Sequence, residues 1–314
     1  MFQQEITPQF SLRLAGGEKQ MQIKKILWAS DGSKESREAL RWAELCATRL
    51  GASVSALSVI ESPDLCTLEL PDDVKRKIAL IDHRLGRKTD NRLKRLGRVL
   101  EQKGIKTETR VVIGIPYQEI IKAARSHDVD LIAMGKRGLN FWGRTLLGST
   151  ATKVLRESHV PILTVRHAAK KPAVKKILVP SSFSPADNVA LEWALEFAGK
   201  LGASVVLLHI FQAHKSWDTV KGGFMGRLRR VATEKLDAML ETVPAQKRKG
   251  VPVITRVKVF SRPWSGIVSF VREEGIDMTV MGTHARKGVP RFFLGSVAER
   301  VIREAPCPVI NIRP

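Results

Sequence analysis

Stretches of nearly identical sequence occur twice in this chain of 314 residues, and this duplication constrains the fold more than any other feature. The sequence LGASV at residues 50–54 returns at 201–205, an offset of 151. The sequence LGS at residues 147–149 returns at 294–296, an offset of 147. A net deletion of four residues between these anchors reconciles the two registers. The chain therefore contains one structural unit in two tandem copies, each about 150 residues long, which is an ordinary domain length.

Each copy alternates short apolar runs, which predict strands, with apolar residues at helical spacing. In the first copy the expected strands are residues 23–30, 53–60, 106–113, 131–134 and 162–165. The expected helices are residues 37–50 and 72–103, with two more that begin near Pro116 and Gly148. Residues 174–312 repeat this order. Strands separated by helices predict an α/β fold of two tandem doubly wound domains, each a parallel sheet covered on both faces.

The boundaries follow from the repeat. Residues 1–20 are polar and contain glycine, so we expect a flexible lead-in. The first domain is expected at residues 21–167 and the second at 174–314. Residues 168–173 form a linker that is too short to let the domains move far apart.

Charge is the unusual part of the composition, because the formal net charge is +22. Residues 1–171 carry 31 basic and 19 acidic residues, and residues 172–314 carry 22 and 12, so the excess is spread over both copies. Such a field attracts polyanions without choosing among nucleotides, nucleic acid and anionic lipid.

Three scattered cysteines form no disulfide or zinc pattern, which is typical of a reducing cytoplasm. No apolar run reaches the length of a membrane span, and residues 1–20 do not have the pattern of a secretory signal. The sequence therefore predicts a cytoplasmic protein.

The strongest motif is Gly135-x-x-Gly138, nine further residues and then Gly148-Ser149. Glycines let a backbone approach a ligand closely and adopt positive φ, and the helix expected from Gly148 offers N-terminal amides to a phosphate. Asp31 follows the first strand and lies at the same edge of the predicted sheet. The spacing indicates a nucleotide phosphate site. The alternative is that these are turn and cap glycines without a ligand.

These residues, with Met134 before the motif, PILTV at residues 161–165 and Asp31-Gly32-Ser33, resemble the signature of the universal stress protein family. The resemblance covers about 290 residues, nearly the whole chain, in two copies. It implies five-stranded Rossmann-like domains that pair across their fifth strands, so that a tandem chain imitates a dimer, and further pairing into a homodimer. It also implies binding of ATP, ADP or AMP, with a divalent cation such as Mg²⁺.

Carried over residue by residue, the resemblance gives each position a role. Asp31 would contact the adenosine, and the backbone of Val59 would line the adenine pocket. Gly135 and Gly138 would pass under the ribose and the phosphates, and the β- and γ-phosphates would be held by Gly148, Ser149 and Thr150. Ala29 and Met134 complete the predicted binding residues.

The second copy departs from this pattern. Ser182 stands at the position of Asp31, Ala285 at that of Gly138, and Ser261 at that of Gly114. A degenerate site, retained for folding and pairing, is one interpretation, and a site for a different ligand is the other.

A basic stretch lies between residues 75 and 98, where ten Lys and Arg face only Asp82 and Asp90. Apolar residues recur there at roughly helical spacing, so one face is expected to pack on the sheet: Ile78, Ile81, Leu85, Leu93, Leu96 and Leu100. The charges form either a solvated helix face or a docking surface for nucleic acid, acidic lipid or an acidic protein.

Three functions from different classes remain. The first is an ATP-binding cytoplasmic regulator of the stress response, or nucleotide sensor. The second is a basic scaffold that binds nucleic acid or anionic lipid independently of nucleotide. The third is a slow ATPase, because no dedicated general base is evident for rapid turnover.

Overall fold

The computed structural model describes residues 23–61, 71–137, 147–166, 172–212, 223–283 and 294–313. The first copy contains β1 Lys25–Ala29, α1 Lys34–Leu50, β2 Ser53–Ile60, α2 Asp72–Glu101, β3 Thr107–Ile113, α3 Pro116–Ser126, β4 Leu131–Gly135, α4 Ser149–Glu157 and β5 Ile162–Val165. The second contains β6 Lys176–Ser181, α5 Pro185–Leu201, β7 Ser204–Gln212, α6 Phe224–Glu241, α7 Ala245–Arg248, β8 Val253–Phe260, α8 Pro263–Glu273, β9 Met278–Gly282, α9 Ser296–Glu304 and β10 Val309–Ile312. The lead-in and residues 168–171 of the linker lie outside the described residues.

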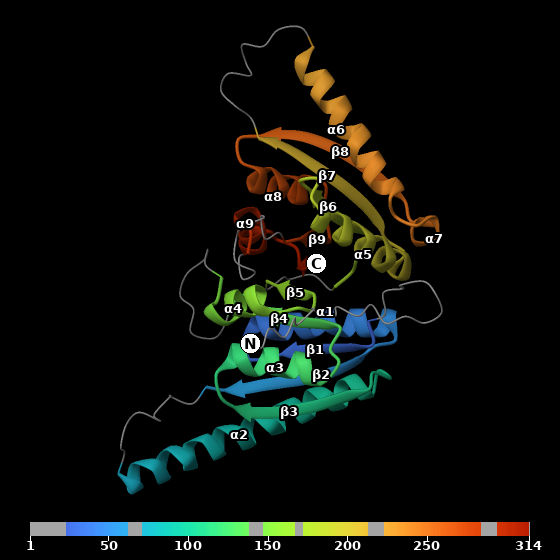
Figure 1. The fold of residues 1–314 in the computed structure, drawn as a ribbon. Coiled ribbons are helices and arrows are strands. Elements are labelled where there is room, and N and C mark those ends of the chain that lie inside the picture. The colour runs from blue at the N-terminus through green and yellow to red at the C-terminus, as the bar shows by residue number, and fades with distance from the viewer. Residues whose placement is uncertain are drawn as a thin grey trace, which may run out of the picture.

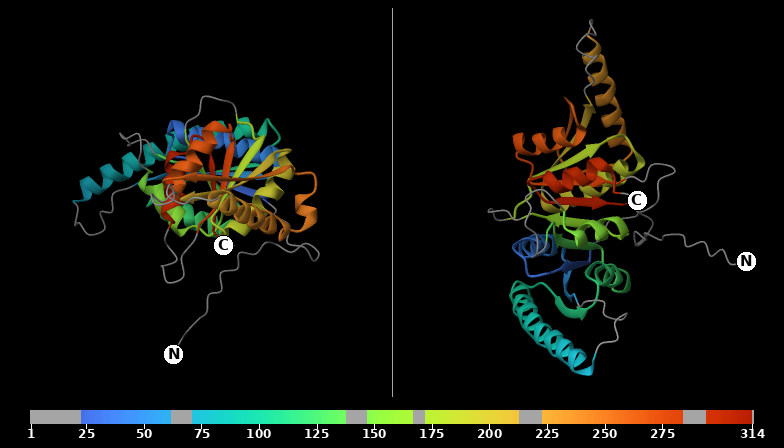
Figure 2. Two further views of the ribbon diagram at one scale, coloured as in Figure 1. Left: turned by 90° about the horizontal axis from the view of Figure 1, so that it is seen from above. Right: turned by 90° about the vertical axis from the view of Figure 1, so that its left-hand side faces the viewer.

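All ten strands form one continuous sheet in the order β3-β2-β1-β4-β5-β10-β9-β6-β7-β8. The five strands of each copy are parallel to one another, and the copies meet where β5 pairs with β10 in antiparallel orientation, with Leu163 opposite Ile310. Figures 1 and 2 show the second copy stacked on the first along this seam. The predicted doubly wound fold is confirmed, and so is the pairing through the fifth strands.

Helices cover both faces of this sheet. One apolar core lies beneath α1, α2, α5 and α6 and contains the buried Trp28 and Phe197. The other lies beneath α3, α4, α8 and α9 and contains the buried Phe270. Because both faces are covered, the central strands are apolar on both sides, as the four buried residues of β5 illustrate.

Local signals in the sequence set several element boundaries. Ser33 caps α1 by accepting a hydrogen bond from the backbone N–H of Ser36, and Gly51 ends the helix with φ 68°. Pro116 opens α3, where its missing N–H leaves no intrahelical hydrogen bond unmade. The observed boundaries agree with the predicted ones to within three residues for the first copy's strands and its two fully bounded helices.

The second copy does not repeat the first in full. Its helix α6 has 18 residues where α2 has 30, and the short helix α7, which was not predicted, follows it. The apolar face of α2 also differs from expectation, because Leu93, Gly97 and Leu100 are the buried residues of that helix. Ile81 and Leu85 are exposed, and the N-terminal half of α2 runs past the sheet in Figure 1, so the prediction that the whole face packs was wrong. No helix in the described part of the chain is long and apolar enough to cross a bilayer.

Candidate functional site

The site predicted for the first copy lies at the carboxyl ends of β1 and β4, which are neighbours in the sheet. Ala29 is registered with Met134 across this pair. The chain leaves β1 toward α1 on one face and leaves β4 toward α4 on the other, so this is the switch point at which doubly wound sheets bind their ligands. Asp31 and Gly135 are thereby brought to one rim.

The loop after β1 is a tight turn built around Asp31. The Asp31 carboxylate accepts a hydrogen bond of 2.9 Å from the backbone N–H of Ser33, and Gly32 adopts φ 82°. That φ lies in the left-handed region, which a side chain disfavours. Asp31 itself is exposed, so its carboxylate is accessible from the rim.

Three further predicted residues form the apolar wall behind this loop. Ala29 and Met134 are buried, and Val59 on β2 is partly buried against the same core. The ends of β1 and β2 are held together because the Ser58 hydroxyl donates to the Ser30 carbonyl at 2.7 Å. An apolar surface of this kind suits a planar, largely apolar ring.

Gly135 is needed for the packing of α1 on β4, whether or not a ligand binds. A Cβ at this position would lie 3.0 Å from the backbone carbon of Glu35 and 3.0 Å from the backbone nitrogen of Ser36. The missing side chain lets the first turn of α1 pack on the end of β4. Gly282 does the same in the second copy, where a Cβ would lie 2.6 Å from the backbone carbon of Ala186. This glycine is therefore required for helix packing in both copies.

The phosphate end of the predicted site is the N-terminus of α4. Gly148 precedes the helix with φ −61°, and no side chain in the described part of the chain caps it. Ser149 is exposed and Thr150 partly exposed at this end. Gly148 therefore has negative φ, and Gly135 is absent from the positive-φ glycines of the described residues, so neither uses the left-handed conformation that glycine allows. Gly138 lies outside those residues.

An ion pair that the sequence analysis missed joins α1 to the loop after β4. The Glu35 carboxylate accepts hydrogen bonds from the Arg137 backbone N–H at 2.8 Å and from Nε at 3.0 Å, and it lies 2.9 Å from Nη2. The two side chains are 10% and 21% exposed, so water screens the pair only in part. We call this pair the Glu35–Arg137 clamp. The partners lie 102 residues apart, and no local pattern links them.

Two arginines, also missed, lie against Gly32. Arg37 donates to the Gly32 carbonyl at 2.6 Å. The guanidinium of Arg92, from α2, occupies the space that a side chain on Gly32 would need, and its buried Nε has no hydrogen-bond partner among the described residues. Arg92 belongs to the basic stretch of the sequence, but only the fold shows that it differs from its neighbours by reaching the rim.

Lys136 links the rim to the seam between the copies. Its backbone carbonyl accepts a hydrogen bond from the Gly148 N–H at 2.9 Å, which closes the loop between β4 and α4. Its side chain is 3% exposed and donates to the Ala305 carbonyl of the second copy at 3.0 Å. Burial lowers the pKa of Lys136 to about 8.

The equivalent rim of the second copy is built differently. Ser182 stands in place of Asp31, and both its N–H and its hydroxyl donate to the Asp187 carboxylate, at 2.8 and 3.0 Å. Phe183 replaces Gly32 and holds φ 64°, a conformation that costs a residue with a side chain about 1 kcal/mol or more. Ala186 replaces Glu35, so the clamp has no counterpart there.

Aromatic rings gather around Phe183. The ring of His209 lies 4.4 Å from that of Phe183 and 4.7 Å from that of Phe211, and its Nδ1 is 2.9 Å from the Ser181 carbonyl. Burial lowers the pKa of His209, with smaller contributions from neighbouring groups.

The pairing of β6 with β9 is shorter than that of β1 with β4 in the first copy. It ends at Leu178, because Pro180, at the position of Ala29, has no N–H to extend the ladder.

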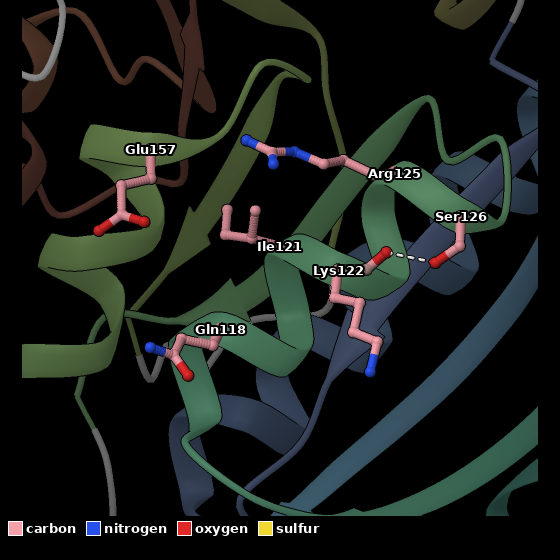
Figure 3. Close-up of a pocket in the computed structure, with 6 residues that line it drawn as sticks. All are labelled: Gln118, Ile121, Lys122, Arg125, Ser126 and Glu157. Carbon is pink, nitrogen blue, oxygen red and sulfur yellow. Dashed lines mark hydrogen bonds between the residues drawn. The ribbon is translucent and has the colours of Figure 1, made fainter.

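One surface hollow of about 440 Å³ lies away from the rim, between α3 and α4 (Figure 3). Its lining residues are Gln118, Ile121, Lys122, Arg125, Ser126 and Glu157, none of which was predicted to bind nucleotide. Within the described ranges, no group of three His, Cys, Asp or Glu side chains converges to hold a metal ion.

Comparison with known proteins gives a consistent result. The model of the universal stress protein family matches residues 22–166 and again residues 173–313. Universal stress proteins from Mycolicibacterium smegmatis and Mycobacterium tuberculosis are 26% and 28% identical, each over 92% of this chain and over 97% and 96% of their own lengths. A crystal structure of a universal stress protein from Archaeoglobus fulgidus is 25% identical with a TM-score of 0.66, and it covers 93% of this chain and 99% of that one.

Proposed function

We propose that this chain, which belongs to the universal stress protein family, binds one adenine nucleotide at the rim of its first copy and acts as a cytoplasmic, nucleotide-responsive regulator of the stress response. The observation that supports this most directly is the register of Ala29 with Met134. It sets the Asp31 turn beside the loop that leads to the uncapped N-terminus of α4.

The rim suits the parts of an adenine nucleotide. The apolar wall would receive the adenine, and Asp31 would accept hydrogen bonds from the ribose. Gly148, Ser149 and Thr150 would hold the terminal phosphates through backbone amides and hydroxyls, with a divalent cation such as Mg²⁺ bound to those phosphates. Arg37, Arg92 and Arg137 add positive charge around the same loop.

Hydrolysis is not part of the proposal. Neither carboxylate described at this rim is placed as a base, because Glu35 is held by Arg137 and Asp31, which is exposed and accepts the Ser33 N–H, is assigned to the ribose. A general base must be free to take a proton from an attacking water. A nucleotide sensor therefore accounts for the site better than a rapid ATPase does.

One nucleotide per chain is expected, because the second rim lacks the charged groups of the first. Replacing a charged acceptor such as Asp31 by Ser182 removes part of a hydrogen bond that contributes about 1.5–3 kcal/mol. Ala285 at the position of Gly138 would add about 1 kcal/mol or more if that position needs positive φ, and the two differences together correspond to a site that is roughly 30- to 1000-fold weaker.

Calorimetric titration with ATP and Mg²⁺, preceded by mass spectrometry of small molecules released from the purified chain, tests the proposal. We expect one adenine nucleotide per chain, and loss of binding when Asp31→Ala is combined with Gly138→Val. The matched change Ser182→Ala in the second copy should leave the affinity unchanged. A stoichiometry of two, or wild-type affinity in the double variant, would contradict the proposed site.

A further inference from the structure

Much of helix α2 extends beyond the body of the molecule, and α6 projects in the same way at the opposite end (Figures 1 and 2). Helix α2 has 30 residues, and its buried residues, Leu93, Gly97 and Leu100, all lie in its last third. Figure 1 shows its N-terminal half running past the ends of β2 and β3 at one end of the molecule. Among the described residues, this half approaches the sheet at its end, where a Cβ on Gly86 would lie 3.7 Å from Ile60 Cδ1, so packing on the sheet does not explain the apolar residues before it.

That half carries an apolar stripe, which we define as Val74, Ile78, Ile81 and Leu85. Their spacing of four, three and four residues places them on one side of the helix. Ile81 and Leu85 are 55% and 47% exposed. Large apolar side chains that share a face and remain exposed indicate a surface that receives a partner.

A cationic sector lies alongside this stripe. Lys77, Arg84 and Lys88 are spaced seven and four residues apart, so they line one flank of the stripe, and Arg76 and Arg87 extend the charge around the helix. All five side chains are exposed. The ion pairs that the structure shows near them, Lys75 with Asp72 and Lys77 with Asp73, are long and exposed, at 3.7 and 3.8 Å. The positive charge of this surface is therefore largely available to a partner.

We propose that the N-terminal half of α2 docks on an anionic lipid surface, with the apolar stripe in the acyl boundary and the cationic sector among the headgroups. An exposed helix with a narrow apolar face beside a broad basic one has the character of an interfacial helix. Nucleic acid would use the cations and leave Ile81 and Leu85 in water. A second copy of the chain would bring together two bodies that each carry a net charge of +22.

Co-sedimentation of the full chain with vesicles tests this inference. One set of vesicles contains phosphatidylglycerol and phosphatidylcholine in equal parts, and the other contains phosphatidylcholine alone. Binding is expected to the anionic vesicles only and should weaken as salt rises from about 0.1 to 0.5 M. Arg84→Gln, Arg87→Gln and Lys88→Gln together should weaken it about 100-fold, at roughly fivefold for each cation.

The decisive variant removes the apolar contact and keeps every charge. Ile81→Gln with Leu85→Gln should weaken vesicle binding about 30-fold, because both side chains would lose their apolar environment. The matched control is Val231→Gln on α6, which changes a 49% exposed apolar residue at the other end of the molecule. It should bind vesicles as the wild type does. None of the substituted residues belongs to the proposed nucleotide site, so ATP affinity should be equal in all three chains.

Two results would overturn the inference. If Ile81→Gln with Leu85→Gln binds anionic vesicles at wild-type strength, the contact is a non-specific attraction of polyanions, and a DNA duplex should compete with the vesicles equally for both chains. If light scattering shows a dimer without lipid that this variant dissociates, the stripe is an interface between two copies. Arg92 stays unchanged in these tests because its guanidinium lies against Gly32.

Discussion

Removal of the charge from Glu35 should loosen the loop after β4 without changing any residue proposed to touch the nucleotide. Glu35→Gln keeps the shape of the side chain and one carbonyl oxygen. It replaces the carboxylate that accepts the Arg137 N–H and guanidinium hydrogen bonds at 2.8 and 3.0 Å. The Arg137 guanidinium then stays in a partly buried position without its counter-charge.

The size of the effect follows from that burial. Hydrogen bonds to charged groups contribute about 1.5–3 kcal/mol each, and a partner that stays 21% exposed recovers some of this from water. We therefore expect Glu35→Gln to lower the free energy of unfolding by about 1–2 kcal/mol. If the loop must be ordered again when the nucleotide binds, the ATP affinity should fall about 5- to 30-fold.

Urea unfolding and calorimetric titration measure the two effects, and Glu44→Gln is the matched control. Glu44 lies on the same helix and pairs with Lys103 at 2.5 Å, but those side chains are 29% and 49% exposed. An exposed pair of this kind contributes about 0–1 kcal/mol, and it lies away from the rim. Equal stability and equal ATP affinity in the two variants would refute the clamp as a support of the loop.

Two further predictions concern the seam and the glycines. Burial lowers the pKa of Lys136 from 10.5 to about 8. Between these two pH values the folded chain has released a proton that the unfolded chain still holds. The free energy of unfolding therefore rises with pH across that window. Lys136→Met should have a free energy of unfolding about 2 kcal/mol higher than that of the wild type at pH 7, and this difference should vanish toward pH 10.5. A difference that does not change with pH in urea titrations would contradict the prediction. Gly282→Ala should destabilise by about 1–3 kcal/mol and Gly135→Ala by somewhat less, because a Cβ would lie 2.6 and 3.0 Å from backbone atoms of the facing helix. Gly226→Ala on α6 has open space and should be neutral or stabilising in the same thermal melts, and an equal loss in all three variants would argue against the packing role.

The fold was largely predictable because its determinants are local and occur twice. The strand before Asp31 and the helix capped by Ser33 follow from neighbouring residues, and their return at an offset of 151 makes the assignment independent of any one segment. The N-terminal half of α2 was mispredicted for a physical reason. Helical spacing of apolar residues shows that they share a face but not that the sheet extends far enough to cover it.

The site was less predictable because its contacts join distant parts of the chain. Asp31, Ala29 and Met134 could be placed on one rim from strand order alone. Glu35 and Arg137, and Gly32 and Arg92, lie against each other only because α1, α2 and the loop after β4 converge there. A composition count finds these charged residues without distinguishing them from the many others on the surface.

The difference between the copies separates the residues that the fold needs from those that a ligand would need. Gly135 and Gly282 are both required where a helix packs on a strand end. Gly148 and Gly295 both precede a helix and both have negative φ. Because the two copies share these glycines, the glycines alone do not indicate a nucleotide site. The copies differ in groups that the fold does not require: the Asp31 carboxylate becomes Ser182, and the clamp residue Glu35 becomes Ala186. The first copy has the charged turn and the Glu35–Arg137 clamp. The second copy has the same fold without either of them. A ligand at the first rim would give them a role, and this makes the charged residues, rather than the glycine motif, the stronger argument for the proposed nucleotide binding there.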